Sequence, residues 1–233
     1  MSLLGARDPA QPLLTLYDGP ARVELSGATT ANWVAKSANL LLDGLGAPDR
    51  VGLLLPLHWQ TVALLLAGAA TGATVVLAAD PADLAGCPVA FVLAEHAEAA
   101  LDAGVEDVLA LSGHPFGAAL PVLPPMVLDY AREVPSYGDR FTGSPGTAAR
   151  LEIDGRPAGP PPDLGLTGTD RVLTTLDPAT PAGLLLGLLA PLAAGAALVL
   201  VPDPTGVDLQ AITATERVTA TVGAAVRGLR ALD

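Results

Sequence analysis

The same order of charged, apolar and glycine positions occurs twice in this chain. Two segments, 49–81 and 170–204, each begin with Asp-Arg-Val, continue through a long apolar block to Gly-Ala, and close with an apolar run and Asp-Pro. In each, a short apolar run precedes a block rich in Leu and Ala, and a second apolar run follows the glycine. Leu and Ala favour helix, and glycine readily adopts the left-handed conformation that ends one. Each segment therefore predicts a strand, a helix and a second strand.

The four predicted strands contain apolar residues on both faces, at 51–55, 74–77, 172–176 and 198–201. The predicted helices are 59–70 and 182–194. Strands that are apolar on both faces and alternate with helices are typical of parallel sheets with helices on either side. The predicted fold class is therefore α/β, with mainly parallel sheets flanked by helices in two related strand–helix–strand lobes.

The similarity between the two halves extends upstream. Residues 21–27 match 149–155, which aligns Arg22 with Arg150. Three matches in the same order, including charged residues, favour an internal duplication. The alternative is chance similarity in a chain dominated by Ala, Gly and Leu.

The remaining pattern predicts further elements around these two units. We expect a helical turn at 13–17, a strand at 22–25 and a helix from a cap at Thr29 or Thr30 to about Gly44. Strands are expected at 89–93, 105–111 and 218–222, helices at 95–102, 208–216 and 224–232, and either element at 127–133. In the second repeat, the Gly- and Pro-rich stretch 135–169 has no counterpart of the helix that ends at about Gly44 and forms a link instead. These patterns predict a lobe at 1–134, a link at 135–169 containing the first strand of the second repeat, and a shortened lobe at 170–233.

Composition and charge exclude several classes of function. The chain has 233 residues, a net charge of −12, and Lys36 as its single lysine. Nucleic-acid binding and attachment to anionic membranes both need clustered basic residues. The charge-free runs are interrupted by Gly-Ala turns, and no leader is apparent at the start, so we expect no membrane insertion. A single cysteine, Cys87, excludes an intrachain disulfide and is typical of the reducing cytoplasm.

The order of short motifs resembles a known family. Leu25-Ser26, Asp49-Arg50-Val51, Leu55-Pro56 and Gly72-Ala73 resemble the start of the large domain of the AMP-dependent synthetase and acyl-CoA ligase (adenylate-forming) superfamily. Asp170-Arg171-Val172-Leu173, Ala194-Gly195-Ala196 and Arg217-Val218-Thr219 are similar to its later segment. The chain is most similar to a short actinobacterial branch. The resemblance implies the N-terminal part of that domain, covering less than half of a full member.

The family's nucleotide motifs are incomplete here. Its phosphate loop is rich in Ser, Thr and Gly and ends in Pro-Lys-Gly, whereas the corresponding stretch here is 141–150. The residues that match the loop best are Thr142, Ser144, Thr147 and, in place of the lysine, Arg150. Pro145 removes an amide donor, and the repeat instead places Arg150 on a strand. The adenine motif, the ribose aspartate and the C-terminal lysine domain have no counterpart. The cofactor that the resemblance implies is ATP or AMP with Mg²⁺, and the residues themselves identify none.

Other candidate groups follow the predicted strands, because ligands of open α/β sheets bind at the carboxyl ends of the strands. These groups are His58, Ser112, His114, Thr175 and Asp177. Asp177 stands where the family often has a histidine, and His58 and Asp177 are the weak catalytic candidates. The structural alternatives are a turn histidine stacked on Trp59 and polar residues in surface turns. No spacing typical of a metal site, a nucleophile elbow or a dinucleotide fingerprint occurs.

Three hypotheses follow. The leading one is a catalytically degenerate member of the family that binds a small molecule or a protein partner in the crevice between the lobes. The second is a residual AMP- or ATP-dependent acyl-activating ligase, either alone or with a site that another protein completes. The third is a homodimeric interaction module that buries exposed apolar surface.

Overall fold

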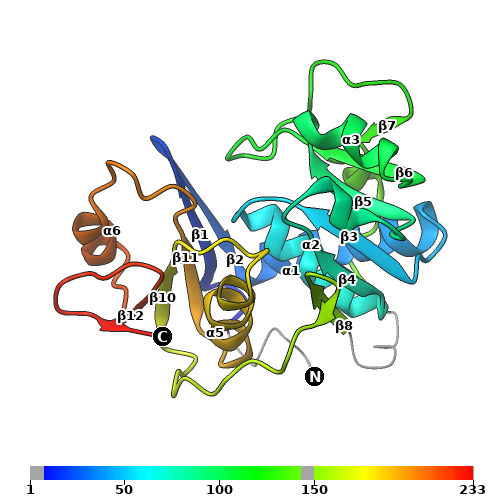
Figure 1. The fold of residues 1–233 in the computed structure, drawn as a ribbon. Helices are drawn as coiled ribbons and strands as arrows, with labels where there is room; N and C mark the ends of the chain where they lie inside the picture. The colour runs from blue at the N-terminus through cyan, green and yellow to red at the C-terminus, as the bar shows by residue number, and fades with distance from the viewer. Residues whose placement is uncertain (1–7, 143–149, 233) are drawn as a thin grey trace. The chain divides into compact units, whose positions relative to one another are not determined.

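The computed structural model describes residues 8–142 and 150–232, which form two compact units. One unit comprises the chain up to Thr30, the short segment Pro56–Trp59, and the chain from Gly159 onward. The other comprises Ala31–Leu55 and Gln60–Ala158. Each unit contains one sheet, and both sheets are mainly parallel with helices beside them (Figure 1). The predicted α/β class is confirmed.

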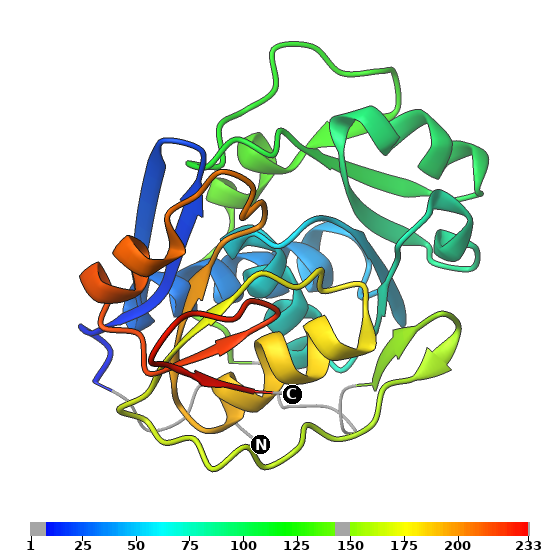
Figure 2. The same ribbon diagram turned by 60° about the vertical axis from the view of Figure 1, so that its left-hand side comes forward.

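The first unit contains a six-stranded sheet in the order β13-β12-β10-β11-β1-β2. Its strands are β1 (Pro12–Asp18), β2 (Ala21–Ser26), β10 (Arg171–Thr174), β11 (Ala197–Leu200), β12 (Ala220–Val222) and β13 (Arg230–Ala231). β1 is antiparallel to β2 and parallel to β11, and Figures 1 and 2 show the blue hairpin beside orange β11. The N-terminal hairpin is therefore part of the sheet built mainly from the C-terminal chain.

Helices lie on both faces of this sheet (Figure 1). The π-helix η5 (Gly183–Leu189) and α5 (Ala190–Ala193) cover one face, where Gly187 lies against Thr174. α6 (Leu209–Thr215) covers the other face, where its Ile212 packs in a core cluster with Leu173 and Val199. Because neighbouring residues of a strand point to opposite faces, Leu173 faces α6 and Thr174 faces η5.

The second unit contains a seven-stranded sheet in the order β7-β6-β5-β3-β4-β8-β9. Its strands are β3 (Arg50–Leu54), β4 (Thr74–Leu77), β5 (Val89–Leu93), β6 (Asp107–Leu111), β7 (Val127–Asp129), β8 (Arg150–Ile153) and β9 (Arg156–Pro157). All neighbouring pairs are parallel except β8 with β9. The carboxyl ends of β3, β4, β5 and β6 therefore lie along one edge of the sheet.

The helical segments of this part of the chain are short apart from two. They are α1 (Gly27–Asn39), η1 (Leu40–Gly44), α2 (Trp59–Thr71), η2 (Pro81–Leu84), η3 (Ala94–His96), α3 (Ala97–Asp102), α4 (Tyr130–Glu133) and η4 (Val134–Ser136). Buried Tyr130 joins α4 to α1 through a 2.8 Å hydrogen bond to Ser37, and its ring contacts Phe91 edge-on. Along the described residues no helix is long and apolar enough to cross a membrane.

The two strand–helix–strand segments have matching geometry. Thr74 N donates to Asp49 O at the start of the second strand of one segment, and Ala197 N donates to Asp170 O at the same place in the other. The glycines that end the helices, Gly72 and Gly195, both have positive φ, at 82° and 76°. Both helices therefore end in the left-handed conformation that the Gly-Ala pairs predicted.

The upstream match between 21–27 and 149–155 does not correspond to equivalent positions. β2 is an edge strand antiparallel to its neighbour, whereas β8 is parallel to β4 and lies inside the sheet. By position and direction, the counterpart of β8 is β1. Arg22 and Arg150 are therefore not structural equivalents.

Several local predictions differ from the structure. Residues 13–17 form strand β1 rather than a helical turn, because buried Leu14 and Leu16 pair with β11. Residues 224–232 form turns and the short strand β13 rather than a helix. The hydroxyl oxygen of Ser26, not of Thr29 or Thr30, accepts a backbone N–H of the first turn of α1.

The compact units also divide the chain differently from the expected segments 1–134, 135–169 and 170–233. β1 and β2 lie in the sheet of the C-terminal chain, and β8 and β9 lie in the sheet of the other unit. Strand pairing between distant segments sets this division, and linear composition does not reveal it.

Candidate functional site

The carboxyl edge of the six-stranded sheet holds Thr175 and Asp177. The Asp177 carboxylate is exposed and accepts a hydrogen bond from Ala179 N at 2.9 Å. The Asp177 carbonyl accepts from the Thr180 hydroxyl at 2.7 Å, and that hydroxyl accepts from Gly183 N at 3.0 Å. This ladder forms the turn that leads into η5. Asp177 therefore stabilises the turn that precedes η5.

The turn before η5 is tightly closed. A Cβ atom on Gly183 would lie 1.8 Å from Asp177 O, so only glycine fits without a backbone shift. Thr175 lies beside the end of β12, where its N–H donates to Val222 O at 3.2 Å. Its hydroxyl is close to Gly223, since a Cβ there would lie 2.8 Å from Thr175 Oγ1. Backbone thus occupies the space next to both candidate groups.

His58 lies directly before α2 and is 6% exposed. Its ring centroid is 5.4 Å from that of Trp59, with the planes inclined by 35°. Trp59 is itself buried. Of the two alternatives for His58, the structure has the histidine packed on its aromatic neighbour.

Ser112 and His114 follow β6 at the carboxyl edge of the seven-stranded sheet. The Ser112 hydroxyl donates to Ala118 O at 2.6 Å and accepts from His114 N at 3.2 Å. His114 Nδ1 accepts from Phe116 N at 3.2 Å. The hydroxyl proton of Ser112 is thus directed to a carbonyl rather than to the imidazole. The two side chains form a turn and not a nucleophile–base pair.

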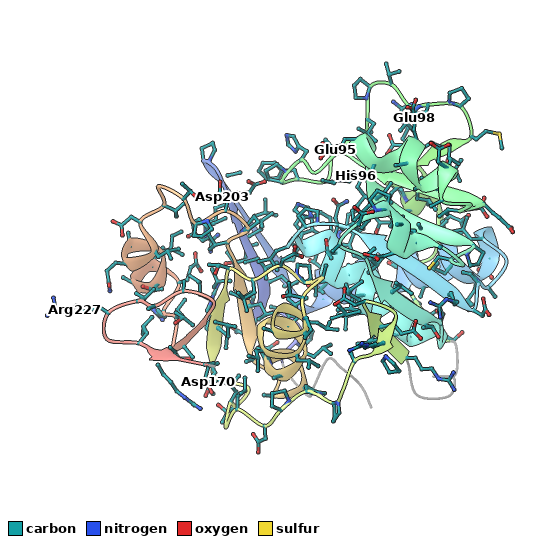
Figure 3. All side chains as sticks on the ribbon, viewed as in Figure 1. Glu95, His96, Glu98, Asp170, Asp203 and Arg227 are labelled. Carbon is teal, nitrogen blue, oxygen red and sulfur yellow. The ribbon has the colours of Figure 1, made fainter. Side chains whose placement is uncertain are left out.

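Nearby acidic residues do not add a metal centre. Glu95, His96 and Glu98 lie close together in sequence after β5 and are labelled in Figure 3. His96 Nε2 is 3.7 Å from a Glu95 carboxylate oxygen, and the Glu95 side chain is 74% exposed. Across residues 8–142 and 150–232, no group of three or more His, Cys, Asp or Glu is arranged to hold a metal ion.

The phosphate-loop candidates lie largely outside the described residues. Ser144 and Thr147 fall in 143–149, which the structure does not describe, and Thr142 is an exposed residue just before that stretch. Arg150 is exposed and begins β8, where it pairs with Thr74 at the start of β4. It therefore lies at the amino edge of the sheet, opposite the edge that holds Ser112 and His114.

Figure 3 also labels three charged residues of the other unit, Asp170, Asp203 and Arg227. Burial tends to raise the pKa of Asp170, but hydrogen bonds from Thr219 and Thr167 outweigh it and lower that pKa. Hydrogen bonds from Thr205 lower the pKa of Asp203. Both carboxylates thus stabilise turns in the ionised form.

A buried charge cluster, absent from the sequence predictions, lies under α6. The Glu216 side chain is 3% exposed and accepts hydrogen bonds from Tyr17 Oη at 2.6 Å, Arg22 Nε at 2.7 Å and Arg171 Nη2 at 2.5 Å. Arg171 also donates to the Thr15 hydroxyl at 2.7 Å. The cluster joins three strands to the end of α6 and so fixes this helix on the sheet.

The cluster keeps its carboxylate ionised. Burial raises the pKa of Glu216, but hydrogen bonds from Arg22 and Tyr17 and the charge of Arg171 outweigh burial and hold that pKa below its usual value. Burial and the bond to Glu216 raise the pKa of Tyr17. The sequence held one signal for this cluster, the repeated Asp-Arg-Val that contains Arg50 and Arg171. In the structure, these two arginines begin corresponding strands, and each binds a glutamate.

Comparison with known proteins gives one clear relative. No family model matches the chain. The chain is 44% identical over 223 residues to a protein of Mycobacterium tuberculosis H37Rv described as "TIGR03089 family protein", and the match covers 91% of each chain.

Solved structures that match this chain include an acyl-CoA synthetase and a CoA ligase. Brucella canis acyl-CoA synthetase matches with a TM-score of 0.72 at 19% identity, over 94% of this chain and 46% of that one. Anthranilate CoA ligase AuaEII, in complex with anthranoyl-AMP, gives 0.73 at 18%, over 94% and 48%. Apo MatB from Rhodopseudomonas palustris gives 0.70 at 17%, over 95% and 48%. The chain spans about half the length of these structures, and at these identities the likeness concerns the fold alone.

Proposed function

Because the chain belongs to the TIGR03089 family and has the fold of the N-terminal domain of AMP-dependent acyl-CoA synthetases, we propose that it is a catalytically degenerate relative of those enzymes. Its role is to bind a small molecule or a protein partner on the retained scaffold without forming an acyl-adenylate. We also propose a cytoplasmic location, which the single, buried Cys87 supports.

The observation that carries this proposal is the use of polar groups at the carboxyl ends of the strands. Enzymes of open α/β folds place reactive side chains there, directed at a ligand. Here the Ser112 hydroxyl donates to Ala118 O, His114 Nδ1 accepts from Phe116 N, and the Asp177 carboxylate accepts from Ala179 N. Each group bonds the backbone of its own turn. This supports a scaffold whose strand-end residues maintain loops instead of performing chemistry.

The test is adenylation by the purified protein. Carboxylate-dependent exchange of pyrophosphate into ATP would be measured with a panel of acetate, malonate, benzoate and a long-chain fatty acid, beside an active acyl-CoA synthetase as control. We expect exchange no faster than in the absence of protein. Exchange that requires both the carboxylate and this protein would refute degeneracy.

A second candidate function is nucleotide binding, as a remnant of acyl activation or as half of a site that another protein completes. It is favoured by two fold neighbours, one in complex with anthranoyl-AMP and one, a MatB chimera, bound to ATP. Thr142 and Arg150 would carry it on this chain, with Mg²⁺ accompanying ATP. Ser144 and Thr147 complete the candidate loop in the sequence.

Calorimetry separates the two candidates. Mg-ATP and AMP would each be titrated into the wild type, into Arg150→Ala, and into Arg156→Ala as a matched exposed arginine on β9. Nucleotide binding predicts heat that Arg150→Ala abolishes and Arg156→Ala keeps. Absence of heat with the wild type contradicts nucleotide binding and leaves the degenerate scaffold. Equal affinity in both variants contradicts a role for Arg150 in that binding.

A further inference from the structure

The connection from β6 to β7 is an uncharged segment of a strongly acidic protein. Residues 112–128 contain no Asp, Glu, Lys or Arg, although the whole chain has a net charge of −12. Part of it is the loop that leads into β7 in Figures 1 and 2. Val122 and Met126 are each 81% exposed, and Leu128 on β7 is 37% exposed. We call residues 121–128 the apolar loop.

The apolar loop is held at its base. Leu120 N donates to the buried Asp129 carboxylate at 2.8 Å, and Arg132 donates to Leu120 O at 2.9 Å. Leu120 and Leu123 pack against a core cluster of the unit. Proline restricts its own φ and the conformation of the preceding residue, and the loop contains three, at 121, 124 and 125. A segment restricted in this way loses little entropy on binding.

Met126 occupies a strained position. Its φ is +70°, and Val127 N donates to Pro124 O at 3.4 Å around a turn. Glycine or asparagine is the usual residue where φ is positive, and other side chains incur a cost there. At 81% exposure the Met126 side chain gains little packing in return. Strain without benefit to the fold is characteristic of residues used for contact.

The four sheet edges differ in how they resist pairing with another chain. In the described part of the molecule, three terminal strands carry an arginine or a proline. These are Arg22 on β2, Arg156 and Pro157 on β9, and Arg230 on β13. On β7, the fourth, the one charged residue, Asp129, is buried, and the exposed residue is Leu128. Exposed charges and prolines blunt edge pairing, and β7 is the terminal strand that exposes neither.

We propose that the apolar loop and the β7 edge are a self-association surface whose occupant is a second copy of this chain. Two molecules of charge −12 repel each other, and an uncharged surface lets them approach with the least repulsion. A twofold pair would use the same surface on both molecules. A loop and a three-residue strand offer less than the ~20–30 residues per side of a standard interface. The dimer is therefore concentration-dependent.

Salt dependence identifies the driving force. Screening weakens the repulsion between the acidic molecules, while apolar contact does not depend on charge pairs. Sedimentation velocity of the wild type would be measured over a wide protein concentration range at low salt and at ~0.3 M salt, where the Debye length is only several Å. We expect a monomer–dimer equilibrium that strengthens with salt. A monomer at every concentration and salt level overturns the proposal, as does dissociation by salt.

Three variants test the surface itself. Val122→Ser is expected to weaken dimerisation about tenfold, since burial of a valine side chain stabilises by ~1.5 kcal/mol or more. Met126→Gly is expected to weaken it similarly while raising Tm by about 2–4 °C, because glycine relieves the left-handed strain. Phe116→Ser is the control, an apolar residue 64% exposed that precedes the Leu120 anchor. Association lost equally in Phe116→Ser would indicate non-specific adhesion and refute the surface, as would unchanged association in the other two.

Discussion

Replacing Glu216 by glutamine tests whether the buried charge cluster holds α6 on its sheet. The substitution keeps the size of the side chain but removes the charge that Arg22, Arg171 and Tyr17 share. Losing one partner of a fully buried ion pair costs about 3–5 kcal/mol. Arg22 is 42% exposed and keeps a second carboxylate, Glu24, so part of that cost is offset. We expect a loss of about 2–3 kcal/mol in the free energy of unfolding at pH 7.

The pH dependence follows from the direction of the pKa shift. The pKa of Glu216 is lower in the folded protein than in the unfolded chain. Its contribution to stability is therefore fully present above the unfolded value, ~4.3, and is lost as pH falls through the lower folded value. The difference between wild type and Glu216→Gln should be constant above about pH 5 and should shrink below about pH 4.

The assay is urea unfolding followed by circular dichroism between pH 7 and pH 3.5. Glu24→Gln serves as control, because Glu24 binds the same arginine but its side chain is 35% exposed, and its replacement should cost less than about 1 kcal/mol. If Glu216→Gln is as stable as Glu24→Gln at pH 7, or its deficit stays constant to pH 3.5, the cluster does not stabilise the fold as argued.

Two further substitutions test the packing. The Thr221 hydroxyl is buried and has no hydrogen-bond partner in the described part of the protein, so Thr221→Val should raise stability by about 1 kcal/mol in a thermal melt, and a lower Tm would contradict this. Gly183→Ala would place Cβ 1.8 Å from Asp177 O and should cost about 2–3 kcal/mol in urea unfolding. Gly159→Ala has open space around its Cβ and should be nearly neutral; equal losses in both alanine variants would show that the close approach is unimportant.

Local patterns predicted the elements that depend on local interactions. The strands β3, β4, β10 and β11, with a helix between the members of each pair, follow from short apolar runs, Leu- and Ala-rich blocks and the glycines after them. The ambiguity at 127–133 also has a local cause, since strand β7 passes directly into α4 there. In the structure, the Asp129 carboxylate accepts from Ala131 N and caps the first turn.

Pairing between distant segments could not be derived in this way. The short apolar run of β1 is compatible with a strand or a helical turn, and its pairing with β11 makes it a strand. The same applies to the end of the chain, where residues 230–231 pair with β12 instead of forming a helix. The strand partners are chosen by tertiary packing, which overrides local propensity.

The candidate site was predictable in position but not in role. Topology places Ser112, His114, Thr175 and Asp177 after strands, as expected. Whether a hydroxyl faces a base or a carbonyl depends on turn geometry that residue types do not specify. The Glu216 cluster was missed for another reason, because Arg22 and Glu216 are far apart in sequence and no local pattern links them.

The position of the N-terminal hairpin has a consequence for synthesis on the ribosome. β1 and β2 emerge well before Leu198, the residue of β11 with which Leu14 pairs. At ~5–20 residues per second, the hairpin waits about 10–35 s with one long edge unpaired. Meanwhile the residues of the other unit, through Ala158, can complete their own sheet. The nascent chain thus carries an exposed apolar edge until β11 has been synthesised, which makes this interval the period of greatest risk of misassembly and the stage at which a chaperone would be needed.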